Sequence, residues 1–573
     1  MSDTPRVPHH LRRFVVEQDY GQYTEVDQAV WRFVLLQTYE RLQHTAHAAY
    51  RRGLAETGIS VERIPRIAEI NQSLSRFGWQ AVCVDGFIPP RAFQEFQAAS
   101  ILPIAAEMRT KDHLTYTPAP DIIHEAAGHA PILPDARYAA YLRAIGEVGK
   151  KAFATPDDAR VYRAIFELSE LKERRGVHPD LVACAEAGLE QALSDVRTTS
   201  EASRLSRLYW WTAEYGLVGT PADYRLYGAG LLSSLWESHA CHDPRVRKLP
   251  LTAACVEQSY DITRTQPQLF VARDFEHLFS VLGEVDARLA YRAGGERALR
   301  EALASEEVAT LHFRSARFVT GQLDAVFGTA DEGVLSFAGR VGFGADGGLL
   351  EIVDGGAQGY RLPHGTLVGG AQLNRLAPCG NRVTLRYASG ACLEGELAAL
   401  KLDSSGRLLS LRLTDYHLVC ERAGLSERGA EYVLFDASGF QTAHAGASDP
   451  AYFPDSEASR KRVPHGAPLR ARERALLALY ERALAAFHAH LGRAALPVFA
   501  EIHAELSRSF PDEWLLRWNL LECLCKLGRD PADGLRRTLE AELAALELKF
   551  SNREPIASGL RYLAALAPQR APL

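Results

Sequence analysis

Two histidines and a glutamate, His124, Glu125 and His129, stand close together in the segment 117–131. Neutral imidazoles bind zinc, copper, iron and nickel, so this segment predicts part of a transition-metal site. Zinc peptidases carry the pattern His-Glu-x-x-His, which sets two histidines four residues apart on one face of a helix. Here the second histidine comes five residues after the first, and position 128 is glycine. The spacing therefore disfavours a zinc peptidase.

A regular helix would not bring the two imidazoles together. Over five residues an ideal helix turns so that the side chains point roughly 140° apart. His124 and His129 can bind one metal ion only if the helix is distorted or ends there, and Gly128 permits a distortion. Asp121 predicts the start of this helix, because an acidic cap satisfies free amide donors, and Pro131 predicts its end.

Two further segments add a family resemblance. Residues 117–131, Thr-Pro-Ala-Pro-Asp-Ile-Ile-His-Glu-Ala-Ala-Gly-His-Ala-Pro, resemble the iron-binding signature of the pterin-dependent aromatic amino acid hydroxylases. Residues 209–217, Tyr-Trp-Trp-Thr-Ala-Glu-Tyr-Gly-Leu, resemble the family segment that carries the third iron ligand. Residues 227–234, Tyr-Gly-Ala-Gly-Leu-Leu-Ser-Ser, follow at the family distance. The resemblance runs from about residue 23 to about residue 275.

The resemblance implies an iron(II) site formed by His124, His129 and Glu214, with positions left open for oxygen. It implies a tetrahydropterin that supplies two electrons, dioxygen as co-substrate, and an aromatic amino acid whose ring is hydroxylated. The resemblance also implies that Glu125 lies at the catalytic centre, beside the cofactor. Dioxygen reacts sluggishly with closed-shell organic molecules, which is why a redox metal is needed.

The spacing of the third ligand predicts an insertion. Glu214 follows His129 after 85 residues, far more than expected of animal family members, so an insertion is predicted near 154–203. One helical stripe of apolar residues predicts that it is helical: Tyr162, Ile165, Leu168 and Leu171. Such an excursion either covers the site or binds a partner, and both alternatives are open.

The resemblance also assigns an amino acid site. Arg109 matches the arginine that binds the substrate carboxylate, a task that suits a bidentate guanidinium. Thr117 and Ser233 are implied to complete this clamp, with Ser233 also orienting His124. The ring pocket is implied to be apolar and aromatic, formed by Pro118, Pro120, Trp210, Tyr215 and Gly230.

For the pterin, Phe93 matches the family's stacking phenylalanine, in the segment 86–93 that also holds Ile88. Glu125 and Tyr209 match residues that face the cofactor. Position 103 is proline, where animal members carry a pterin-contacting histidine. Since bacterial members commonly have proline there, the resemblance implies a bacterial type of site.

Two positions favour phenylalanine as the substrate, with L-tyrosine as the product. Ile262 occupies the position at which tyrosine hydroxylases carry an aspartate, and Trp210 one at which tryptophan hydroxylases tend to have phenylalanine. A single apolar contact discriminates by only ~1–3 kcal/mol, so a hydroxylase of tryptophan, tyrosine or a modified aromatic amino acid is the first alternative. The second is a metal-binding regulatory protein without turnover, which would need a further protein ligand.

Composition is that of a soluble cytoplasmic enzyme. The chain has 573 residues, 47% apolar and 24% charged, and a net charge of −6. It shows no apolar run long enough to span a bilayer, no signal core, and no basic tract for nucleic acid. Nine cysteines without regular spacing argue against a disulfide framework. His239, Cys241 and His242 are not predicted to bind metal, because no fourth group matches them.

The length predicts several domains. We expect a mainly α catalytic domain of the aromatic amino acid hydroxylase type at 1–305, beginning with amphipathic helices such as 27–57. A small β-rich domain is expected at 306–440, then a linker at 441–468 and a helical C-terminal domain at 469–573. The prediction of a β-rich domain rests on two runs in which apolar residues alternate with others. The first run is Val383, Leu385 and Tyr387, and the second, after the turn 403–406, is Leu409, Leu411 and Leu413.

Two apolar stripes predict two or three helices at the C-terminal end of the sequence. They are Leu476, Tyr480, Leu484, Phe487 and Leu491, then Trp514, Trp518, Leu521 and Cys525. Such stripes bury against whatever is nearest. Either the catalytic domain or a second copy of the chain, in a homo-oligomer, is expected to cover them.

Overall fold

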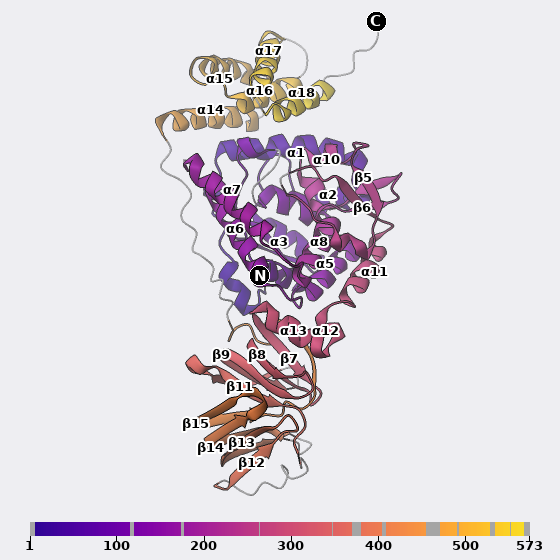
Figure 1. Cartoon of the computed structure of the whole chain (residues 1–573). Coiled ribbons are helices and arrows are strands. Elements are labelled where there is room, and N and C mark those ends of the chain that lie inside the picture. Colours follow the sequence, from indigo (N-terminus) through magenta and orange to yellow (C-terminus); the bar gives the residue numbers. More distant parts are fainter. Residues whose placement is uncertain are drawn as a thin grey trace.

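The structure, a computed structural model, describes residues 6–114, 120–173, 177–262, 264–345, 348–368, 380–403, 408–453, 470–489, 492–527, 533–550 and 552–566. Helices dominate up to Ser305, strands run from Val308 to Ala445, and helices return from Ala471. The three parts are stacked along the long axis of the molecule, with the strand-rich part at one end and the last helices at the other (Figure 1). The predicted order of helical, strand-rich and helical parts is therefore present.

The first part, which we call the catalytic part, is mainly helical. Its α-helices are α1 (Glu25–Thr45), α2 (Ala48–Glu56), α3 (Ile67–Ser75), α4 (Pro90–Ala98), α5 (Ala136–Gly149), α6 (Pro156–Glu173), α7 (Pro179–Ser194), α8 (Glu201–Tyr209), α9 (Ala229–Ser233), α10 (Glu237–Ala240), α11 (Phe275–Asp286), α12 (Ala290–Ala293) and α13 (Gly295–Ser305). Strand β1 (Gln80–Val84) pairs in parallel with β2 (Ile101–Ala105). A second sheet has the order β4-β3-β6-β5, formed by Leu217–Gly219 (β3), Tyr224–Leu226 (β4), Arg247–Pro250 (β5) and Gln268–Ala272 (β6).

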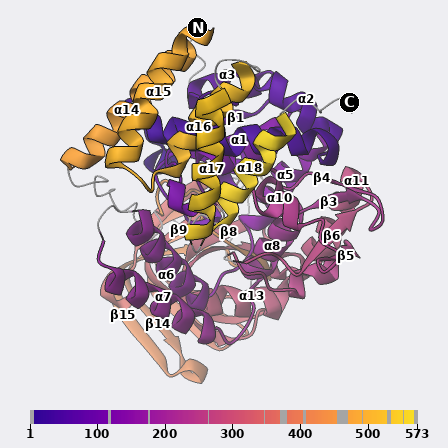
Figure 2. The same cartoon turned by 90° about the horizontal axis from the view of Figure 1, so that it is seen from above.

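Helix α1 differs from the amphipathic helix predicted at 27–57. It ends at Thr45, and Ala46 and His47 separate it from α2. The residues at 29–38 are all buried, so no side of this stretch faces solvent. A helix that is buried all round must be covered on both faces. The catalytic part covers one face of α1, and the C-terminal helices cover the other (Figures 1 and 2).

The strand-rich part consists of two antiparallel sheets over one shared hydrophobic core. The first sheet has the order β10-β9-β8-β7-β16, with β11 also paired to β9, and the second has the order β12-β13-β14-β15. The strands are β7 (Val308–Phe313), β8 (Arg317–Gly328), β9 (Gly333–Ala345), β10 (Gly348–Asp354), β11 (Tyr360–His364), β12 (Arg382–Arg386), β13 (Ala391–Leu402), β14 (Leu408–Cys420), β15 (Leu425–Phe435) and β16 (Phe440–Ala445). Two sheets that share one core form a small β-sandwich.

Two details of this part correct the sequence-based prediction. Leu411 and Leu413 are buried as expected, but Leu409 is only half-buried, because the pairing of β13 with β14 shifts register next to it. Strand β16 occupies 440–445, where a linker was predicted to begin at 441, and pairs with β7. Of the predicted turn 403–406, only residue 403 is among the described residues.

The last part contains five helices among the described residues, rather than two or three. They are α14 (Ala471–His488), α15 (Leu496–Ser509), α16 (Trp514–Leu527), α17 (Asp533–Lys549) and α18 (Glu554–Leu566). Helices α14, α16 and α18 pack against α1, and buried residues of all five helices belong to the same hydrophobic core as the catalytic part. Burial within one copy of the chain removes the reason to expect a homo-oligomer through these faces. Leu491, from the first predicted stripe, lies outside the described residues.

Across the described ranges, no helix combines the length and the apolar character needed to cross a membrane. The eight cysteines within these ranges are free thiols.

Candidate metal centre

The two histidines lie in a π-helical turn, η4 (Ile123–His129). In a π-helix the backbone hydrogen bonds join residues five apart, and here the amide of Ala130 donates to the carbonyl of Glu125. This wider turn is the distortion that the spacing demands, because residues five apart then lie on the same side. The turn starts where expected, since Asp121 Oδ1 accepts a hydrogen bond from the His124 amide at 3.0 Å.

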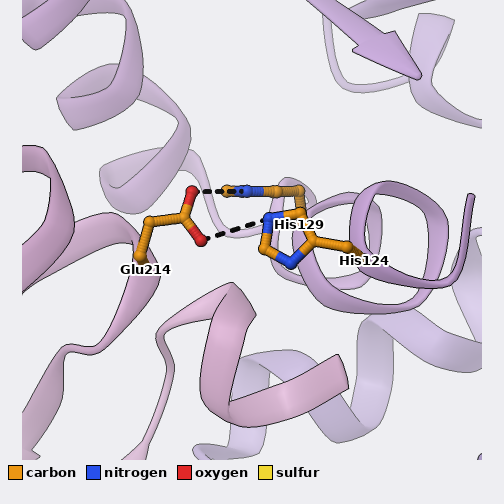
Figure 3. A group of neighbouring side chains, drawn as sticks. All are labelled: His124, His129 and Glu214. Carbon is orange, nitrogen blue, oxygen red and sulfur yellow. Dashed lines mark hydrogen bonds and ion pairs between the residues drawn. The ribbon is translucent and has the colours of Figure 1, made fainter. Parts of the chain in front are cut away.

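A second π-helical turn, η6 (Trp210–Glu214), carries the predicted third ligand. The amide of Tyr215 donates to the carbonyl of Trp210 at 2.8 Å and closes this turn. Glu214 Oε2 lies 3.2 Å from His124 Nε2, and Glu214 Oε1 lies 3.0 Å from His129 Nε2. Figure 3 shows both imidazoles directed at the one carboxylate. The structure thus brings together three side chains that are up to 90 positions apart in the sequence.

The ligand atoms of His124, His129 and Glu214 lie within 4.8 Å of one another. Among the described residues this is the one group of three or more histidines, cysteines or carboxylates close enough to hold a metal ion. His242 instead stacks on Tyr224, with 5.6 Å between the ring centroids, and its Nδ1 lies 3.1 Å from the tyrosine hydroxyl. His242 therefore has an aromatic partner and a hydroxyl contact within the chain.

The charges within the triad favour a cation. Burial by itself would raise the pKa of Glu214, but the imidazoles of His129 and His124 outweigh it and hold the pKa well below its usual range. Burial acts to lower the pKa of His124, yet the Glu214 carboxylate raises the pKa of His124 to about 9. Two imidazoles and a carboxylate are a donor set that suits iron(II), which takes the place of the protons when it binds.

Glycines allow the backbones around the triad to approach closely. A Cβ at Gly128 would lie 2.7 Å from the carbonyl oxygen of Ala229, so η4 can pack on α9 only without a side chain there. A Cβ at Gly228 would lie 2.4 Å from the carbonyl oxygen of Glu214. Gly128 therefore serves close packing as well as the distortion predicted from the sequence.

Ser233 lies where it can orient His124. Its hydroxyl donates to the Ala229 carbonyl at 2.8 Å, so its oxygen can accept from His124 Nδ1 at 3.2 Å. A proton fixed on Nδ1 leaves Nε2, the nitrogen facing Glu214, as the metal ligand.

Arg109 is buried and held by Asp121. Its Nε donates to Asp121 Oδ2 at 2.7 Å and its Nη2 to Oδ1 at 2.8 Å. Burial would raise the pKa of Asp121, but the Arg109 guanidinium outweighs it and lowers that pKa. Asp121 thus joins the predicted substrate arginine to the metal-binding turn. The sequence predicts Asp121 only as a helix cap, although its place in the family signature is a signal for a further role.

The predicted ring-pocket residues are only partly brought together. Trp210 stacks on Tyr215, with ring centroids 4.5 Å apart, and a Cβ at Gly230 would lie 2.7 Å from the Tyr215 ring. Tyr260, which sequence analysis missed, stacks on Trp210 at 4.2 Å between centroids.

Four other predicted substrate residues remain, two of which the structure describes. Ile262 is 38% exposed, two residues after Tyr260. Its assignment to the substrate pocket stays a prediction. Pro120 is half-buried before the metal-binding turn, whereas Thr117 and Pro118 lie outside the described residues.

The predicted cofactor residues border the triad. The rings of Phe93 and Tyr209 meet edge to face at 5.6 Å, and Tyr209 lies 6.5 Å from His129 between ring centroids. Glu125 is buried, which raises its pKa, and its Oε2 has no hydrogen-bond partner among the described residues. A buried acceptor without a partner fits a group that binds there through hydrogen bonds. Ile88 is also buried, so its side chain packs in the core and only its backbone is left for a cofactor.

The predicted insertion contacts the cofactor segment. Tyr162 of α6 stacks on Phe87, with 5.4 Å between centroids, and its hydroxyl donates to the Phe87 carbonyl at 2.9 Å. The insertion therefore packs beside the predicted cofactor segment, and both alternatives for its role stay predictions.

Comparisons with known proteins bear on the same residues. Residues 17–165 and 186–290 match the family model described as biopterin-dependent aromatic amino acid hydroxylase, and the unmatched residues 166–185 fall within the predicted insertion. Phenylalanine-4-hydroxylase of Ralstonia nicotianae is 31% identical over 269 residues, which are 46% of this chain and 72% of that protein. Phenylalanine-4-hydroxylase of Chromobacterium violaceum is 30% identical over 275 residues, 47% of this chain and 77% of that protein.

A solved structure of the Chromobacterium violaceum enzyme, with bound iron(III) and oxidised cofactor 7,8-dihydrobiopterin, is 25% identical to this chain. The aligned region covers 50% of this chain and 92% of the chain in that structure, with a TM-score of 0.38. This score is too low for a comparison of the folds. The sequence matches span the metal ligands and most of each relative. The chain therefore belongs to the family of biopterin-dependent aromatic amino acid hydroxylases.

Proposed function

We propose that the protein is an iron(II)- and tetrahydropterin-dependent monooxygenase that converts L-phenylalanine to L-tyrosine. One observation carries the proposal: two π-helical turns, separated by an insertion, converge His124, His129 and Glu214 on one another. Together with family membership, this convergence supports a metal centre for oxygen chemistry. When bound, iron(II) and the tetrahydropterin supply the electrons that activate dioxygen for hydroxylation of the ring.

The chain's own residues hold and orient the metal. His124, His129 and Glu214 would bind the iron, and Ser233 would fix His124 with Nε2 toward it. Glu125, Phe93 and Tyr209 would bind the pterin beside this site, the first through hydrogen bonds and the rings through stacking.

A second set of residues would bind the amino acid. Arg109, which Asp121 fixes in place, would pair with the substrate carboxylate, because guanidinium and carboxylate match in shape and charge. Trp210 and Tyr215 would form the apolar wall for the ring, together with Gly230. Preference for phenylalanine is supported by this wall and by the relatives' activity, while the contribution of Ile262 stays a prediction.

We also propose the division into domains, with the corrected boundary. Residues 1–305 would form the catalytic domain, 306–445 a β-rich domain without an assigned role, and 470–566 a helical domain that packs on α1. The substrate is a small molecule, and neither nucleic acid nor membrane is proposed as a partner. A cytoplasmic location stays a prediction from the cysteine usage.

Product analysis tests this function. Iron(II)-loaded protein is mixed with oxygen, a tetrahydropterin, and equimolar phenylalanine, tyrosine and tryptophan, and the products are identified by mass spectrometry. We expect new tyrosine only when iron and pterin are both present. Hydroxytryptophan as the main product would contradict the proposed substrate, and a lack of pterin oxidation would contradict the proposed chemistry.

A further inference from the structure

The C-terminal helices share one hydrophobic core with the catalytic part, although the match to the family model ends at residue 290. Phe33 of α1 meets Trp514 and Trp518 edge to face, with ring centroids 5.2 and 4.7 Å apart. Arg32 Nη2 pairs with Glu522 Oε2 at 3.0 Å, and the Arg32 and Glu522 side chains are 3% and 0% exposed. Figures 1 and 2 show these helices lying over α1. Such contacts fix the helices relative to the catalytic part.

One ion pair reaches from these helices to the predicted substrate clamp. Lys111 Nζ lies 2.6 Å from Glu513 Oε2, and the Glu513 side chain is only 4% exposed. Glu513 is itself held, since it accepts from the Tyr480 hydroxyl at 2.7 Å and from the Leu515 amide at 3.2 Å. Lys111 stands two residues after Arg109, in the short 3-10 turn η3 (Lys111–His113). A fixed acceptor directly before α16 therefore tethers the backbone beside the arginine.

Helix α18 lies behind the other half of the clamp. Residues from both sides line one small cavity, with Leu114, Leu235 and Trp236 from the catalytic part and Glu554, Pro555 and Ser558 from α18. Leu235 follows Ser233 by two residues, and its carbonyl accepts from Arg41 of α1 at 2.9 Å. The C-terminal helices thus support both chain segments that carry clamp residues.

We propose that the C-terminal helices position the amino acid clamp, with Lys111 and Glu513 as positioning residues. This inference rests on the proposed function. The guanidinium and the amide of Arg109 are fixed by Asp121, but the residues directly after it, 110–114, have no strand pairing and form one short turn. Anchoring that segment to a buried acceptor reduces the freedom that substrate binding would otherwise have to remove.

The test compares Lys111→Met with wild type. We expect the KM for phenylalanine to rise about fivefold, while kcat and the KM for the tetrahydropterin change by less than about twofold, as for contacts that couple to a site without touching the ligand. Asp512→Asn is the matched control, because Asp512 is adjacent to Glu513 but pairs with Lys549 inside the C-terminal helices. This control should leave all three constants unchanged.

Two further measurements make the inference refutable. The double variant carries Lys111→Met and Glu513→Gln. Its KM for phenylalanine should be no higher than that of Lys111→Met alone, because both substitutions remove the same contact. Hydrogen exchange of residues 106–114, measured without substrate or cofactors, should be faster in Lys111→Met than in wild type. Unchanged exchange, or equal effects on both KM values, would overturn the inference. Failure of the proposed function would appear instead as absence of tyrosine from the wild-type reaction.

Discussion

Replacing Asp121 by asparagine tests how much the buried ion pair with Arg109 contributes to the free energy of unfolding. The Asp121 carboxylate receives three hydrogen bonds from Arg109, from Nε at 2.7 Å, Nη2 at 2.8 Å and the amide at 3.0 Å, and one from the His124 amide. Asparagine keeps the volume but loses the charge and one acceptor. Removal of one partner of a buried ion pair costs ~3–5 kcal/mol, because the other charge is left uncompensated. We expect Asp121→Asn to lower the free energy of unfolding by about this amount at pH 7.

The effect should depend on pH with a defined sign. The pKa of Asp121 in the folded protein lies below its ordinary value of 3.8, so folding favours the charged carboxylate. Its stabilisation is complete above roughly pH 5 and is lost as the pH falls through the folded-state pKa. The difference between wild type and Asp121→Asn should therefore be constant from pH 6 to 8 and shrink in acid, roughly below pH 4.

Urea unfolding followed by tryptophan fluorescence measures this difference. Asp223→Asn is the control, since Asp223 forms an exposed pair with Arg225 at 2.8 Å and should cost less than ~1 kcal/mol. An Asp121→Asn protein as stable as the control at pH 7, or a difference that grows in acid, would refute the reasoning.

Three other substitutions probe the iron, its orientation and the cofactor segment. Glu214→Ala should abolish iron binding and turnover, and iron content by atomic absorption near that of wild type would show that the third ligand is elsewhere. Ser233→Ala should weaken iron binding about 10–100-fold by freeing the His124 ring, which titration with iron(II) measures; an unchanged affinity would rule out that role. Tyr162→Ala should raise the KM for the tetrahydropterin more than Tyr162→Phe does, since the phenylalanine keeps the stacking on Phe87. The same KM in both variants and in wild type would exclude α6 from the cofactor site.

The sequence predicts the metal ligands well because their spacing and flanking residues are specific. A five-residue separation of histidines requires a distorted helix, and the structure has a π-helical turn there. Glu214 could be placed only through the resemblance, since the insertion before it hides the spacing. The stacking of Tyr260 on Trp210 could not be predicted, because it depends on how the chain after 257 folds back over the π-helical turn.

Long-range packing explains the remaining differences. Residues of α1 were expected to form an amphipathic helix, yet 29–38 are buried throughout because helices from the far end of the chain cover it. Periodicity within α1 contains no information on that second partner. Strand β16 was missed for a similar reason, since its pairing partner β7 lies more than a hundred residues earlier.

Isotope labelling tests directly whether the protein is a monooxygenase that hydroxylates phenylalanine. Iron(II)-loaded protein is given phenylalanine and a tetrahydropterin under ¹⁸O₂, and the tyrosine formed is analysed by mass spectrometry. The proposed function predicts one ¹⁸O atom in each new tyrosine, and no tyrosine when either iron or pterin is omitted. Tyrosine without the label, or pterin oxidation without any hydroxylated phenylalanine, would contradict it.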